Sequence, residues 1–101
     1  MRHYVLATVY DKRGNVLSRA ENSYTKTHPY QAMMARRSGI PEKIFLHAEI
    51  AALIRCRTGQ PYRIKIERYN KSNEPMLAKP CPICEAAIKE AGIRLVEYTI
   101  G

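Results

Sequence analysis

Two short segments of this chain carry side chains that can bind a metal ion or transfer a proton. The first is HAE, residues 47–49, and the second is PCPIC, residues 80–84. Together they supply one imidazole, one carboxylate and two thiols, from His47, Glu49, Cys81 and Cys84. Either motif alone is weak evidence, but both motifs in this order predict a single chemical site.

Each segment stands where a helix is expected to begin. The spacing of apolar residues predicts a helix from about Ala48 to Arg57 and another from Pro82 to Ala91, each followed by a glycine. A helix N-terminus has unpaired N–H groups and partial positive charge, which favour thiolate over thiol. Because the first residue of such a start is not yet helical, His47 and Glu49 can face the same point ahead of the helix.

These residue types predict a catalytic zinc site. His47, Cys81 and Cys84 would give a tetrahedral zinc ion three protein ligands and leave its fourth position open for water. Zinc lowers the pKa of its bound water to about 7. Glu49 is then the remaining carboxylate, and it could accept the proton of that water and deliver it to a ring nitrogen and a departing amine.

Two other interpretations of the motifs stay open. Cys81 and Cys84 could form a redox dithiol, because CPIC at a helix start resembles a thioredoxin-type pair. That interpretation leaves His47 and Glu49 unexplained. A structural zinc site would instead need a fourth protein ligand, for which the candidates are Cys56, His28 and His3.

The other elements must place these two helices on a sheet. The pair Gly14-Asn15 separates two β-type runs and predicts a hairpin, and a helix is expected over Pro29–Arg37 with Thr27 as its N-cap. The predicted strands cover residues 3–11, 16–21, 62–69 and 93–100. Strands that alternate with helices in this way predict an α/β fold with parallel pairs and crossover helices.

Length and composition restrict the class of protein. The 101 residues predict one domain, residues 1–101, and 46% hydrophobic with 26% charged residues is ordinary for a globular protein. No apolar run approaches the roughly 20 residues of a membrane span, and the N-terminus has a strand pattern rather than that of a signal peptide. We therefore expect a cytoplasmic protein without a membrane partner, whose net charge of +8 attracts phosphates.

The paired motifs resemble those of the cytidine and deoxycytidylate deaminase superfamily of zinc-dependent nucleobase deaminases. The chain resembles a short member that retains the core and lacks peripheral elements. The resemblance implies a three-layer α/β/α sandwich with a mixed sheet of about four strands. It also implies hydrolytic deamination of the cytosine base of a (deoxy)cytidine nucleoside or nucleotide to uracil, with zinc-bound hydroxide attacking C4 and Glu49 as proton shuttle.

The resemblance extends to ENSY, residues 21–24, which is similar to the loop that contacts the substrate ribose in cytidine deaminases. It implies that Asn22 binds substrate, together with Ala48 and Pro80 inside the two motifs. A turn-capping role for Asn22 is the alternative. Three aromatic residues could stack on a base, although core packing is the commoner role, namely Tyr24, Tyr30 and Phe45.

The motifs do not choose between cytosine and adenine, or between a small molecule and a polymer. The ENSY loop favours a nucleoside or nucleotide. Single-stranded DNA or RNA is the alternative, but no basic tract is interleaved with the aromatic residues, as a polymer groove would need. A chain this short that lacks flanking helices is also expected to form a homo-oligomer.

Overall fold

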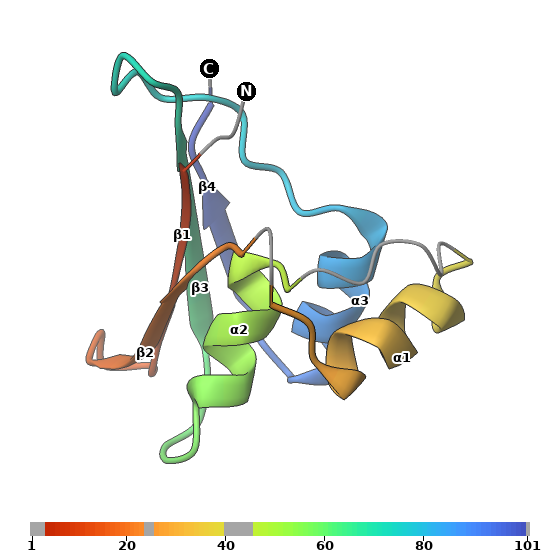
Figure 1. Ribbon diagram of the computed structural model, residues 1–101. Coiled ribbons are helices and arrows are strands. Elements are labelled where there is room, and N and C mark those ends of the chain that lie inside the picture. Colours follow the sequence, from red (N-terminus) through yellow and green to blue (C-terminus); the bar gives the residue numbers. More distant parts are fainter. Residues whose placement is uncertain (1–3, 24–25, 40–45, 101) are drawn as a thin grey trace.

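The structure, a computed structural model, describes residues 4–23, 26–39 and 46–100 (Figure 1). In chain order these residues form β1 (Tyr4–Tyr10), β2 (Val16–Glu21), α1 (Pro29–Arg37), α2 (Ala48–Arg55), β3 (Arg63–Tyr69), α3 (Pro82–Glu90) and β4 (Leu95–Tyr98). This order confirms the predicted α/β class, and both motif helices begin at the predicted residues. None of these helices is long and apolar enough to span a membrane.

The four strands form one mixed sheet in the order β2-β1-β3-β4. Strand β1 is antiparallel to both β2 and β3, whereas β3 and β4 are parallel and α3 makes the crossover between them. The β1–β2 connection turns at Gly14, whose φ of 90° suits glycine. The Asp11 carboxylate accepts the N–H groups of Arg13 and Asn15 and fixes the turn, which confirms the predicted hairpin.

The described helices all lie on one side of the sheet (Figure 1). The strand residues that face α2 and α3 are apolar and buried: Ala7, Val9, Ala20, Ile64 and Ile66. Alternate positions carry charges, such as Arg19 on β2 and Lys65 on β3, and these two side chains are exposed. One face of the sheet therefore packs against the helices, whereas the other face carries exposed charges on either side of the buried Thr8. The described residues do not form the second outer helical layer of the predicted α/β/α sandwich (Figure 1).

Helix α1 packs against the other two helices rather than against the sheet. A second buried cluster joins residues of α1, α2 and α3 and contains no strand residue: Met34, Ala35, Ile50, Ile83, Cys84 and Ala87. The two motif helices are therefore held between the sheet on one side and α1 on the other. This double packing fixes the relative positions of their N-termini.

The N-cap of α1 is His28, so the prediction of Thr27 was wrong. The backbone of His28 is extended, with φ −151° and ψ 141°, and its Nδ1 accepts the N–H of Tyr30 at 3.0 Å. The reason lies in Pro29, the first helical residue. A residue before proline is restricted to extended conformations, which is also the backbone conformation of an N-cap.

Ile50 tests how strongly the second cluster stabilises the fold. This side chain is fully buried on α2, and we expect Ile50→Ala to lower the free energy of unfolding by about 2–5 kcal/mol. Ile100→Ala is the matched control because Ile100 is 77% exposed, and its effect should stay within about 0.5 kcal/mol. Urea denaturation measures both, and equal losses would contradict the assignment of Ile50 to a stabilising core.

Candidate metal centre

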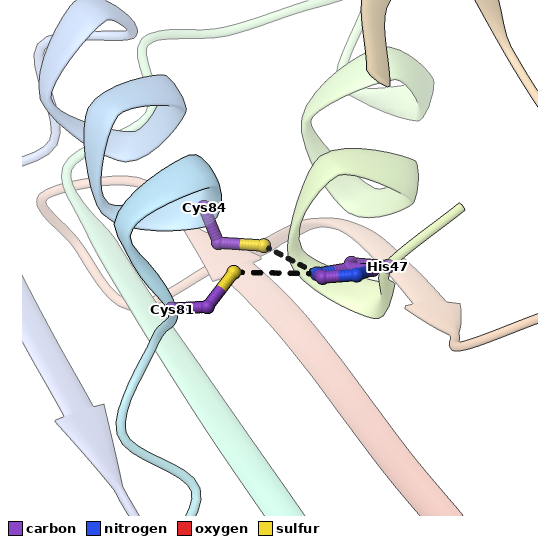
Figure 2. Close-up of side chains that lie close together, drawn as sticks. All are labelled: His47, Cys81 and Cys84. Atoms are coloured by element: carbon purple, nitrogen blue, oxygen red, sulfur yellow. Dashed lines mark hydrogen bonds between the residues drawn. The ribbon is translucent and has the colours of Figure 1, made fainter. Parts of the chain in front are cut away.

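The starts of α2 and α3 meet at one point. His47 is the N-cap of α2, with φ −78° and ψ 153°, and Cys81 is the N-cap of α3, with φ −70° and ψ 167°. Neither side chain forms a capping hydrogen bond to its own helix. Both instead point towards each other and towards Cys84, which lies in the first turn of α3 (Figure 2). The structure thus brings together the three predicted metal ligands.

The distances between the three ligand atoms suit a zinc ion. His47 Nδ1 lies 3.2 Å from Cys84 Sγ and 3.5 Å from Cys81 Sγ (Figure 2), and all three atoms lie within 4.8 Å of one another. Tetrahedral zinc, with bonds of about 2.05 Å to nitrogen and about 2.3 Å to sulfur, would separate nitrogen from sulfur by about 3.6 Å. The chemistry of the donors and their separations therefore both fit zinc.

Within residues 4–23, 26–39 and 46–100, the group holds three ligands and no fourth. Two of the three candidates for a fourth ligand are placed elsewhere. Cys56 is the C-cap of α2, at the opposite end of that helix from His47, and His28 caps α1. His3 lies outside the described residues. A three-ligand group is the arrangement of a catalytic rather than a structural zinc site.

Glu49 lies beside this group but is not one of its members. It occupies the first turn of α2 and is only 7% exposed. Burial raises the pKa of this carboxyl, and the nearby Cys81 adds to the effect, while the Glu49 backbone N–H and His47 oppose it. A carboxyl with a raised pKa exchanges a proton more readily near neutral pH than an ordinary one does.

The two thiols differ sharply in acidity. The hydrogen bond donated by the Cys84 thiol, with a further contribution from His47, lowers the pKa of Cys81 to about 4. That same hydrogen bond and burial raise the pKa of Cys84. Because a ligating thiol must be deprotonated, zinc binding would displace the proton of any thiol that still carries one and would weaken as pH falls.

Asn22 forms hydrogen bonds that hold the end of β2 against β1. Its backbone N–H donates to the Val5 carbonyl, and its Oδ1 accepts the Val5 N–H, both at 3.1 Å. These bonds continue the pairing between β2 and β1 beyond the end of β2. Asn22 also lines a surface cavity of about 580 Å³ with Ser23 and Lys26. His47, Cys81 and Cys84 do not line this cavity. The substrate-binding role of Asn22 therefore stays a prediction.

The other predicted substrate residues flank the metal ligands. The Ala48 side chain is fully buried against the sheet, so any contact with substrate would have to come from its backbone. Pro80 is half-buried and directly precedes Cys81. Among the aromatic candidates, Tyr30 packs half-buried against the second cluster, while Tyr24 and Phe45 lie outside the described residues.

Sequence reasoning missed one residue of this region, Gln31. The side chain of Gln31 is fully buried on α1, and its Oε1 accepts the backbone N–H of His47 at 3.3 Å. A signal existed, because Gln31 precedes the buried Met34 and Ala35 by three and four residues. That spacing places it on the same face of the helix, which is a buried face.

Comparison with models of known protein families gives no match to this chain, and comparison with curated proteins gives none either.

Proposed function

We propose that this protein is a zinc-dependent deaminase that converts the cytosine base of a (deoxy)cytidine nucleoside or nucleotide to uracil. The observation that carries the proposal is the meeting of two helix starts, which places His47, Cys81 and Cys84 within 4.8 Å of one another. The buried Glu49 beside them supplies the proton-transfer group that hydrolytic deamination requires. The resemblance of both motifs to those of nucleobase deaminases supports the same proposal.

Three residues of this chain would hold the zinc ion, and a fourth would transfer the proton. Zinc bound by His47, Cys81 and Cys84 would supply Lewis-acid activation of water, lowering the pKa of that water to about 7. Glu49 accepts one proton from the attacking water and passes it to the ring nitrogen N3, and it then transfers the second proton, from the new C4 hydroxyl, to the leaving amine. The C4–N bond breaks, ammonia leaves and the new C–O bond becomes the carbonyl of uracil.

A deaminase that acts on cytosine or adenine in single-stranded DNA or RNA is the second candidate. The net charge of +8 favours any phosphate-bearing substrate, whether a nucleotide or a polymer. The similarity of ENSY to the ribose-contacting loop of cytidine deaminases supports the small-molecule substrate, and the sequence has no basic tract interleaved with its aromatic residues, as a polymer groove would need.

Ammonia release tests the proposal directly. Purified, zinc-loaded protein is incubated with cytidine, deoxycytidine, their monophosphates, adenosine and a cytosine-containing single strand. We expect release from at least one of the cytosine nucleosides or nucleotides. Release from the strand alone would support the second candidate. Release from adenosine alone would show that the deaminated base is adenine rather than cytosine. No release from any substrate by the loaded protein would overturn the proposed function.

A further inference from the structure

Gln31 is a polar side chain in the middle of an apolar environment. It is fully buried, and the cluster around α1 consists of aliphatic, aromatic and sulfur-containing side chains. A buried amide costs free energy unless its polar atoms are hydrogen-bonded. The Oε1 atom meets this requirement through the backbone N–H of His47, at 3.3 Å. The chain thus keeps a polar group in its interior where it contacts a predicted metal ligand.

The contact falls where the direction of the His47 side chain is set. The backbone of His47 is extended, and the helix begins at the next residue, Ala48. The orientation of the imidazole therefore depends on how the His47 backbone is held before the first turn begins. A hydrogen bond to its N–H restricts that backbone from outside α2.

The position of Gln31 is fixed from both sides on α1. The N-cap His28 and Pro29 determine where the helix begins. One turn further, Met34 and Ala35 pack in the cluster that includes Cys84. Helix α1 therefore contacts both halves of the metal centre, through Gln31 on the α2 side and through apolar packing on the α3 side.

We infer that Gln31 is a positioning residue for the metal centre, which holds the His47 backbone so that Nδ1 faces the two cysteine sulfurs. This inference rests on the metal site of the proposed function but not on the reaction. Groups that orient metal ligands affect affinity strongly, and their loss commonly weakens metal binding by about 10–100-fold.

Three variants separate positioning from general stability. Gln31→Met keeps the length of the side chain and removes the acceptor, whereas Gln31→Glu keeps an oxygen acceptor. Ile64→Ala is the control for a general loss of core packing, because Ile64 is fully buried on β3 and belongs to the other buried cluster, which contains none of the three ligands. Zinc affinity is measured by competition with a chromophoric chelator. The visible spectrum of the cobalt(II)-substituted protein reports the ligand geometry.

We expect Gln31→Met to weaken zinc binding by about 10–100-fold and to alter the cobalt spectrum. Gln31→Glu should restore most of the affinity, and Ile64→Ala should lower the melting temperature but leave the spectrum unchanged. Wild-type affinity in a folded Gln31→Met protein would overturn the inference, as would equal losses in Gln31→Met and Ile64→Ala.

Amide hydrogen exchange in the wild-type protein gives an independent test if Gln31→Met does not fold. The His47 amide should be protected, and exchange at the rate of an unstructured amide would overturn the inference. Failure of the proposed function is distinguishable: zinc binding that depends on Gln31 without ammonia release would overturn the reaction alone. A wild-type protein that binds no zinc would overturn both.

Discussion

Glu49→Gln is expected to lower the rate of deamination by about 10²–10⁴-fold. The amide has the size of the carboxylate but cannot accept a proton from water and return it to the leaving amine. Zinc content should remain at about one ion per chain, since the three ligands needed for a catalytic zinc are unchanged. The same variant therefore separates the loss of proton transfer from the loss of metal.

The position of Glu49 is the reason for expecting a large effect. Glu49 is outside the three-ligand group, is 7% exposed and has a raised pKa chiefly because it is buried. Its carboxyl interacts with the Cys84 side chain and lies near Cys81 and His47. Bulk water would not replace the Glu49 carboxylate as proton acceptor, because the carboxylate is buried and water does not reach its position freely.

Glu85→Gln provides the matched control for this variant. Glu85 also lies in the first turn of a motif helix, α3, but its side chain is exposed to solvent. Initial rates of ammonia release, measured on samples of known zinc content, should fall for Glu49→Gln and stay near wild type for Glu85→Gln. Near-normal turnover of Glu49→Gln would remove Glu49 from the mechanism, and a loss of zinc in that variant would make it a ligand.

The grouping of His47, Cys81 and Cys84 could be predicted from the sequence because its signals are local. His47 and Cys81 are the N-caps of α2 and α3. The other functional residue of each motif, Glu49 or Cys84, lies in the first turn of the same helix. Helix starts are also well marked, here by Pro82 and by the apolar spacing after Ala48. When the N-termini of both helices lie on the same side of one sheet, most packing arrangements of the two helices bring the ligands together.

Element ends were predicted less well because they depend on tertiary contacts. Helix α2 stops at Arg55 rather than near Arg57, since Cys56 leaves the helical conformation with ψ 90°. Strand β4 begins only at Leu95, the first residue that pairs with β3, opposite Arg63. Hydrophobic periodicity alone does not locate either end.

The layer arrangement and Gln31 show two different limits of sequence reasoning. The strand sequence RIKIERY alternates apolar and charged residues, which by itself indicates a sheet with one buried face. The three-layer sandwich is implied by the resemblance alone, and the described residues place helices on one side of the sheet (Figure 1). Gln31 is a different case, because its partner His47 is sixteen residues away. A pattern along one helix can mark a polar residue as buried, but it cannot say which backbone group that residue will meet.

Cys84→Ala is expected to abolish stoichiometric zinc binding. Cys84 is fully buried and its Sγ lies 3.2 Å from His47 Nδ1. Among the described residues the metal-binding group has three members, so this variant leaves it with two. Wild-type protein should contain about one zinc ion per chain. Cys56→Ala is the matched control, because Cys56 lies at the far end of α2, and this variant should keep its zinc.

Stability provides a second measurement of the same variants, because a ligand that binds only the folded state stabilises it. At free zinc about 1,000 times the Kd, this stabilisation amounts to about 4 kcal/mol. A chelator should therefore lower the melting temperature of the wild type and of Cys56→Ala. It should leave the melting temperature of Cys84→Ala unchanged. The cavity left by the lost thiol lowers the stability of this variant equally with and without chelator, so it does not affect the comparison.

The comparison with and without chelator also decides between the zinc site and a redox dithiol. A dithiol would give a zinc-free wild type whose melting temperature responds to oxidant and reductant rather than to chelator. Stoichiometric zinc in Cys84→Ala would instead place the metal elsewhere. The close approach of His47 Nδ1 to both sulfurs, at 3.2 and 3.5 Å, leads us to expect the chelator response, because a redox pair has no need of an imidazole beside both of its thiols.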